Sequence, residues 1–180
     1  LGLIENASET EDLANSVPNS AGVVFVPALT GLGAPDWDPN ARGAIFGLTR
    51  GATRAHVVRA TLEAIAFEVR DVVDVMVNEA DVSLPRLTVD GGAAANNFLC
   101  QAQADQIKVP VVRSEILETT GLGAAFLAGL GTGFWSNKEE LAKTWRSDRT
   151  FEPQDRDEQS HRRWRVAVER TKGWATAVSK

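Results

Sequence analysis

Leu87-Thr88-Val89-Asp90-Gly91-Gly92-Ala93-Ala94-Ala95-Asn96-Asn97 sets the architecture of this chain. Apolar and β-branched residues, an acid, two glycines and a run of helix formers predict a buried strand over 86–90, a sharp turn and a helix over about 94–107. Glycine lets a backbone approach a ligand closely, and a helix N-terminus offers unpaired N–H groups to an anion. The same pattern also fits a plain bend between strand and helix. The stretch alone leaves a phosphate or nucleotide site and an empty turn as equal alternatives.

The composition excludes several classes of protein. The chain has 180 residues and a net charge of −5, so it offers no basic surface for nucleic acid or for an anionic membrane. Its one cysteine, Cys100, excludes an internal disulfide framework, fits a reducing, cytoplasmic compartment and is expected to be a core residue. No apolar run approaches the ~20 residues that span a bilayer. The first residue is Leu1 and the one methionine is Met76, which indicates a fragment.

The first third of the chain predicts two short strands and a long loop. A capping box from Ser8 to Glu11 opens a helix over 9–16, and apolar runs predict strands over 23–26 and 44–48. The loop over 29–43 between these strands carries Asp36-Trp37-Asp38. Loops of this length are often functional. The alternative is that Trp37 fills an edge of the core while both acids face solvent.

A long amphipathic helix is predicted over 54–78, after a cap at Thr53. His56, near its start, is either a ligand contact or, more commonly at such a place, structural. Two ion pairs four residues apart are expected on its outer face, Arg59 with Glu63 and Arg70 with Asp74. The apolar stripe of this helix consists of Val58, Leu62, Ile65, Val69, Val72 or Val73, and Met76.

The remainder continues the alternation of strands and helices, which predicts an α/β layer architecture. Pro110 suggests that the strand over 109–112 is an edge strand. The small residues of the helix over 120–132 suggest close packing or close approach to a ligand. A second capping box, from Ser136 to Glu139, starts a helix to about 145; a polar stretch follows over 147–157, and then a charged helix over 156–178 with Trp164, Val168 and Trp174 as its apolar residues.

The sequence contains no Cys/His metal cluster, no nucleophile elbow and no P-loop. The paired acids have no spacing that fixes their geometry. From the residues alone, we expect an α/β domain with a nucleotide phosphate site, and the residues indicate nothing further.

Four segments resemble motifs of the FGGY carbohydrate kinase family. Gly31-Leu32-Gly33-Ala34-Pro35, followed by Asp36-Trp37-Asp38-Pro39, is similar to a loop of the glycerol kinases of that family, whereas its xylulose kinases carry Gly-Glu-Arg before the proline. The segments run in family order from about residue 20 to 150, and the one departure noted is Gly121, where an alanine is usual. The other three are Gly43-x-Ile45-x-Gly47-Leu48 with His56-Val57-x-x-Ala60-Thr61-Leu62-Glu63, the adenosine motif Val89-Asp90-Gly91-Gly92-Ala93-Ala94-Ala95-Asn96-Asn97-Phe98-Leu99, and Gly123-Ala124-Ala125-Phe126-Leu127-Ala128-Gly129 with Gly133-Phe134-Trp135.

The resemblance implies an α/β domain of the actin-like ATPase (ribonuclease H-like) fold, partial and lacking its first strands. Residues 1–180 would be the C-terminal nucleotide-binding domain of an FGGY kinase, with a helical tail over 151–180. The implied activity is ATP-dependent phosphorylation of glycerol to glycerol 3-phosphate with Mg²⁺, by a cytoplasmic, homo-oligomeric full-length enzyme. The catalytic aspartate, the glycerol pocket and a Gly-Thr-Gly phosphate turn are expected upstream of Leu1. This chain alone is therefore expected to be inactive, and no catalytic or metal-binding residue is assigned in it.

Carried over to the matching positions, the motif places the nucleotide at the glycine turn. Gly92 and Asn96 are expected to contact it, while Gly91 and Ala93 shape the turn. Asp90 either orients the turn or holds a Mg²⁺-bound water, and the structural role is favoured. The alternatives are another FGGY sugar or polyol kinase such as a xylulose kinase, a non-catalytic actin-like nucleotide-binding or assembly module, and a structural domain with an empty turn.

Overall fold

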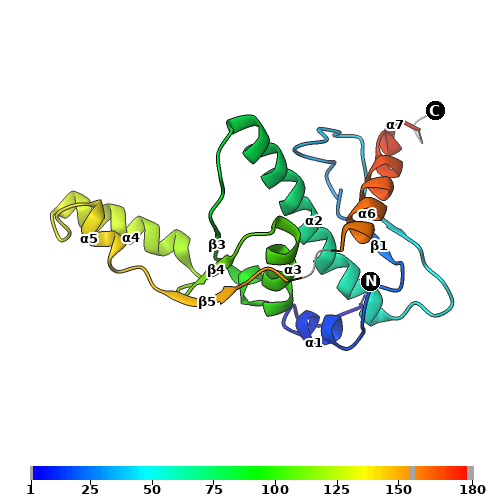
Figure 1. Cartoon of the computed structure of the whole chain (residues 1–180), viewed down its shortest axis with the longest axis horizontal. Coiled ribbons are helices and arrows are strands. Elements are labelled where there is room, and N and C mark those ends of the chain that lie inside the picture. The colour runs from blue at the N-terminus through cyan, green and yellow to red at the C-terminus, as the bar shows by residue number, and fades with distance from the viewer. Residues whose placement is uncertain (1, 155–156, 178–180) are drawn as a thin grey trace.

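The computed structural model describes residues 2–154 and 157–177, and it is an α/β structure built along one long helix, α2 (Figure 1). Elements far apart in the sequence pack against α2, among them α1, α3 and β1. In chain order the elements are α1 (Glu9–Asn15), β1 (Val24–Val26), β2 (Ala44–Phe46), α2 (Arg54–Ala80), β3 (Leu87–Val89), η1 (a 3₁₀ helix, Gly92–Ala95), α3 (Asn97–Ile107), β4 (Val111–Ser114), α4 (Thr119–Thr132), α5 (Lys138–Ala142), β5 (Ser147–Phe151), α6 (Glu158–Thr171) and α7 (Trp174–Ala177).

The strands form two small sheets. β1 and β2 pair antiparallel, with Phe25 opposite Ile45. In the second sheet β4 lies between β3, which is parallel to it, and β5, which is antiparallel. Because η1 and α3 connect the parallel pair, the glycine turn lies at the C-terminal end of β3, as predicted.

The core lies on both sides of α2. On one side Phe67 of α2, Val26 of β1 and Trp164 of α6 are buried together, and the Trp164 indole N–H donates to the Phe25 carbonyl at 3.1 Å. On the other side, residues of α3, β4 and β5 form a second cluster. It includes Cys100, which is 1% exposed and so is a core residue as expected. Burial raises the pKa of the Cys100 thiol, which keeps it protonated.

Two capping boxes were predicted at residues that do not form them. Ser8 has helical dihedrals and makes no side-chain cap bond, because its backbone already follows the helix. Before α5 the cap is Asn137 rather than Ser136. Asn137 is extended, so its Oδ1 accepts the Glu140 N–H at 2.9 Å.

The prediction that Pro110 marks an edge strand is wrong. Pro110 precedes Val111, the first residue of β4, so its missing N–H takes no bond from the ladder. Its carbonyl instead accepts the Leu87 N–H at 2.9 Å. The polar stretch after residue 146 contains a strand, β5, that the sequence did not predict. Four of its five residues are exposed, so it lacks the apolar pattern of a strand.

The amphipathic pattern of α2 is correct near its start and wrong near its end. Arg59 pairs with Glu63 at 2.8 Å as predicted, but Met76 is 63% exposed. Arg70 contacts Asp74 as predicted, yet it is buried rather than on an outer face. The start of α6 packs over this part of α2, and Arg70 also pairs with Glu158 at 2.9 Å.

The long helix predicted over 156–178 is two helices, α6 and α7, with residues 156 and 178 outside the described ones. Gly173, with φ +66°, separates them, and its N–H donates to Asp38 at 2.7 Å. Trp164 and Val168 are buried as expected, but Trp174 is 55% exposed.

α4 and α5 project away from the rest of the molecule (Figure 1). Leu127 of α4 is 73% exposed, and Phe134 just after it is 76% exposed. The close packing expected of the small residues in α4 is found at Gly129, which lies against the Trp135 ring, whereas Gly121 and Gly123 face open space. Among the described residues, no helix is both long and apolar enough to cross a membrane.

Candidate functional site

The glycine turn forms a short 3₁₀ helix rather than the start of an α-helix. Gly91 has φ +82° and ψ 172°, a backbone conformation that is essentially restricted to glycine, and its N–H donates to the Leu117 carbonyl at 2.8 Å. A Cβ added at Gly91 or at Gly92 would meet no atom within 4 Å. The glycine pair therefore makes the bend and also leaves its outer surface open.

The first N–H groups of η1 are available to a ligand. Within the described residues, the N–H groups of Gly92 and Ala93 have no hydrogen-bond acceptor, as is usual at a helix start. They sit at the positive end of the short helix. The turn can therefore donate two backbone hydrogen bonds to an anion or to a polar edge.

Asn96 is the N-cap of α3, whereas the helix predicted over about 94–107 would have included it in its first turn. Its Oδ1 accepts the Leu99 N–H at 2.9 Å, and its Nδ2 donates to Thr10 Oγ1 at 3.0 Å. A side-chain amide has two N–H donors and two acceptor lone pairs. Asn96 therefore keeps one donor and one acceptor for a further partner.

A cavity of about 440 Å³ opens beside the turn, between α1, α2 and the start of α3. Three of the four predicted site residues line it: Gly92, Ala93 and Asn96. Gly91 shapes the bend outside the lining. The rest of the wall combines apolar side chains of α2, η1 and α3 with residues of α1 and of the segment just before it: Leu62, Ile65, Ala95, Leu99, Ala7, Ser8, Thr10 and Glu11.

Helix α1 holds the turn from one side, a contact that the sequence does not predict. The Glu11 carboxylate accepts both the backbone N–H and the side-chain Nδ2 of Asn97, each at 2.8 Å. These residues are 86 positions apart, and no local pattern links them. Glu11, assigned from the sequence to a capping box on α1, instead stabilises the start of α3.

Asp90 ties the turn to the first residue of α4. Its Oδ2 accepts the Thr119 hydroxyl at 2.7 Å, and this supports the structural role favoured from the sequence. The described residues contain no group of three or more His, Cys, Asp or Glu side chains that could hold a metal ion.

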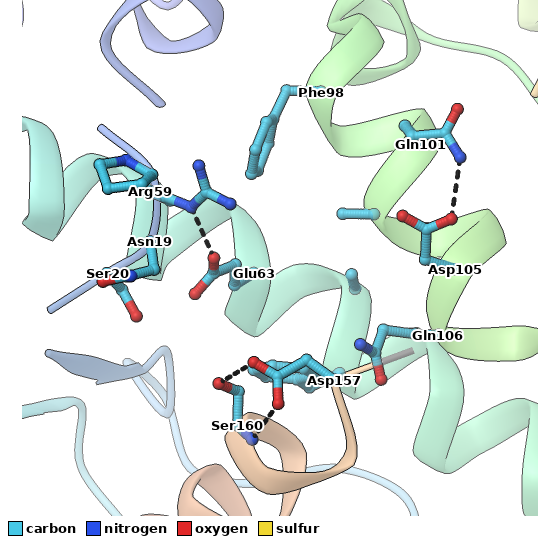
Figure 2. Close-up of a pocket in the computed structure, with 14 residues that line it drawn as sticks. Asn19, Ser20, Arg59, Glu63, Phe98, Gln101, Asp105, Gln106, Asp157 and Ser160 are labelled. Carbon is cyan, nitrogen blue, oxygen red and sulfur yellow. Dashed lines mark hydrogen bonds and ion pairs between the residues drawn. The ribbon is translucent and has the colours of Figure 1, made fainter. Parts of the chain in front are cut away.

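A second, more polar cavity of about 240 Å³ lies between α2, α3 and the start of α6 (Figure 2). The carboxylates that line it already have partners. Glu63 pairs with Arg59, Asp105 accepts from Gln101 at 2.8 Å, and Asp157 caps α6 by accepting the Ser160 N–H at 2.9 Å. Its wall is thus a set of satisfied pairs, whereas the turn carries donors without acceptors.

The acids of the loop over 29–43 are structural, and both halves of the alternative offered for this loop are wrong. Trp37 is 75% exposed instead of filling the core. Asp36 does not face solvent, because it accepts from Arg165 at 2.8 Å and from Lys172 at 2.8 Å. The Arg165 hydrogen bond lowers the pKa of Asp36 below its usual value, against an opposing effect of burial. Asp38 receives the backbone N–H groups of Gly173 and Asn40, which lower its pKa as well.

His56 is a capping residue. Its Nδ1 accepts the Thr53 backbone N–H at 3.0 Å. The Thr53 side chain in turn accepts the backbone N–H of His56, the third residue of α2. The structural alternative for His56 is therefore confirmed.

The chain belongs to the FGGY family of carbohydrate kinases, as the C-terminal domain of that family, which it matches over residues 2–132. Its fold is accordingly that of the actin-like ATPases. It is 59% identical over 180 residues to the glycerol kinase of Aromatoleum aromaticum and 55% identical over 177 residues to glycerol kinase 2 of Thermotoga maritima. These alignments cover 98% and 97% of this chain, and the chain spans 36% of each relative.

Solved structures of the same family agree with this assignment. The crystal structure of Plasmodium falciparum glycerol kinase with ADP superposes with a TM-score of 0.81 at 37% identity, over 94% of this chain and 34% of that one. The ligand-bound xylulose kinase of Lactobacillus acidophilus gives a TM-score of 0.71 at 25% identity, over 99% of this chain and 36% of that one.

Proposed function

We propose that this chain is the C-terminal, nucleotide-binding portion of a glycerol kinase, which transfers the γ-phosphoryl group of ATP to glycerol. The observation that carries the proposal is the open turn at Gly91–Gly92, whose free N–H groups border a cavity. The similarity of the whole chain to a glycerol kinase crystallised with ADP supports an adenine nucleotide as the ligand. The proposal includes that the complete enzyme is cytoplasmic and homo-oligomeric.

The two kinds of wall in the cavity suit the two parts of a nucleotide. Leu62, Ile65 and Leu99 offer an apolar surface to an adenine ring. Gly92 and Ala93 donate N–H groups to the ribose or to the α-phosphate, and the free donor and acceptor of Asn96 reach a polar edge. Gly91 supplies the conformation on which these contacts depend.

Phosphoryl transfer requires positioning and charge stabilisation more than covalent chemistry by the protein. Mg²⁺ would neutralise charge on the phosphates and would be held chiefly by the phosphate oxygens together with residues outside this chain. The residues described here bind and orient the nucleotide. The binding site for the glycerol hydroxyl that accepts the phosphoryl group, and the protein group that takes its proton, are assigned to the remainder of the enzyme.

A panel of acceptors tests the proposal with the complete protein. With ATP and Mg²⁺ we expect phosphorylation of glycerol in strong preference to xylulose and other pentuloses. A strong preference for a pentulose would instead assign the protein to another branch of the same family. ATP binding without turnover on any acceptor would favour a non-catalytic actin-like module.

A further inference from the structure

An arginine from the neighbouring strand supports the glycine turn from behind. Arg113 lies on β4, and its side chain is 13% exposed. One guanidinium nitrogen donates to the carbonyls of Ala94 at 3.0 Å and Ala95 at 3.3 Å, and to Asn97 Oδ1 at 3.1 Å. Arg113 thus contacts the last two residues of η1 and the first of α3 without lining the cavity.

A carboxylate on β5 fixes the orientation of this guanidinium. Asp148 accepts from Arg113 Nε at 2.6 Å and also from a terminal nitrogen, while the Phe151 ring lies 5.5 Å from the guanidinium carbon. Because the guanidinium is a rigid planar fork, holding one edge determines where the other edge points. Asp148 therefore aims the remaining nitrogen at the turn.

The contacts of Arg113 lie at the C-terminal end of η1. A helix end exposes carbonyl oxygens that carry partial negative charge, and a cation there satisfies them. Ala94 is 5% exposed, so its carbonyl region has little access to water. The Ala94 carbonyl has one further partner, the Cys100 thiol at 3.3 Å, which is a weak donor. Loss of the guanidinium would therefore leave these carbonyls poorly paired and would let η1 shift, and Gly92 and Ala93 would move with it.

We propose that Arg113 is a positioning residue for the nucleotide-binding turn, held in place by Asp148. The proposal rests on the proposed function of the turn, and it adds a residue that the family resemblance did not indicate. It makes the geometry of the site depend on β4 and β5, which lie beyond the turn in the sequence.

Arg149 provides a matched control. It lies directly opposite Arg113 in the β4–β5 ladder, and its guanidinium carbon is 4.8 Å from the same Phe151 ring. Its contact with the turn is a single hydrogen bond of 3.4 Å to Asn97 Oδ1. Substitution of either arginine removes one positive charge from the same sheet, but only the Arg113 change removes the support of η1.

The test compares Arg113→Met, Arg113→Lys, Asp148→Asn and Arg149→Met in the complete protein, with ADP affinity measured by calorimetry. For Arg113→Met we expect affinity about tenfold weaker, as for the loss of buried hydrogen bonds to a charged group. Arg113→Lys should restore part of this loss, and Arg149→Met should stay within about twofold of wild type. In steady-state assays the KM for ATP should rise while the KM for glycerol stays unchanged, a split that general destabilisation would not give.

Two further measurements, ADP binding by Asp148→Asn and hydrogen exchange over residues 92–97, test the role of Arg113 when the first comparison cannot be made. If Arg113→Met does not fold, Asp148→Asn retains the arginine without its anchor and should weaken ADP binding by about threefold. Wild-type affinity in Arg113→Met, or in Asp148→Asn when only that variant folds, would overturn the proposal. If the wild-type protein binds no ADP, the proposed function itself fails. Hydrogen exchange over residues 92–97 then tests whether Arg113 holds the turn in place. Exchange no faster in Arg113→Met than in Arg149→Met would overturn that role.

Discussion

Gly91 and Gly92 are adjacent in the turn, but the backbone depends on them differently. Gly91 has φ +82° and ψ 172°, a conformation that side chains strongly disfavour, whereas Gly92 is not among the residues with positive φ. A Cβ at Gly92 would enter open space. Gly91 is thus required for the fold of the turn, and the value of Gly92 lies in the space that it leaves for a ligand.

This difference predicts losses of stability of different size for two alanine substitutions. Gly91→Ala should lower the free energy of unfolding by about 1–3 kcal/mol because it forces a side chain into that conformation. Gly92→Ala should change it by less than about 0.5 kcal/mol. Denaturant unfolding of both variants measures the difference, and equal losses of stability would show that the backbone of the turn is not as described.

Asn96 offers a second test at this scale. Asn96→Ala removes the N-cap of α3 and should cost about 1 kcal/mol of stability. Asn96→Asp keeps the oxygen that accepts from Leu99 but removes the donor to Thr10, so it should retain most of the stability. An alanine variant as stable as the aspartate variant would rule out the capping role.

At the scale of the elements, ion pairs hold the loop over 29–43 to α6 and to the residues just after it. Asp36 and Asp71, both largely buried, accept from the same Arg165 nitrogen at 2.8 and 2.7 Å, and Lys172 adds a second cation to Asp36. His161 contacts Asp71 at 2.8 Å. The loop that carries the glycerol-kinase-like sequence is thereby anchored to the C-terminal helices.

This anchoring predicts a pH dependence of stability. Because its cationic partners lower the pKa of Asp36 below its ordinary 3.8, the ion pairs contribute fully above that pH. Their contribution is lost as the pH falls through the lowered pKa. Asp36→Asn should therefore be less stable by about 1–3 kcal/mol near neutral pH and should lose less stability than wild type on acidification. Parallel pH dependence of unfolding in the two proteins would show that Asp36 does not contribute in this way.

The sequence predicted most elements because hydrophobic periodicity and turn residues are local signals. α2 and the β3–turn–α3 unit follow directly from such patterns. It did not predict which side chains meet across the fold. Glu11 reached Asn97, and Arg113 reached η1, through packing of segments that no local pattern relates. The strand β5 was missed for a related reason: its polar residues face solvent, and its pairing with β4 alone makes it a strand.

For the candidate site, the turn and three cavity-lining residues were found from the sequence: Gly92, Ala93 and Asn96. Its supports were not found, because they come from α1, β4 and β5. The motif thus located residues that line the cavity, whereas the residues that hold them in place depend on tertiary structure.

At the scale of the whole molecule, the chain spans 36% of the glycerol kinases that it matches. In the proposed function the described residues supply one wall of a nucleotide site, and among them no group of three or more His, Cys, Asp or Glu side chains could hold a metal ion. We expect the 180-residue chain alone to bind ATP weakly and to phosphorylate no glycerol. A coupled kinase assay beside ATP calorimetry tests this expectation, and turnover by this chain would refute the assignment of the acceptor site to the remainder of the enzyme.

The most direct measurement is the KM for ATP of the complete protein with Gly92→Asp, with glycerol as acceptor. The aspartate side chain has room to fold into the open space at residue 92, where it places a negative charge beside the phosphates and blocks their approach. The predicted result is a KM for ATP at least about tenfold higher, with an unchanged KM for glycerol. Unaltered ATP kinetics in this variant would show that the nucleotide does not bind at the Gly91–Gly92 turn.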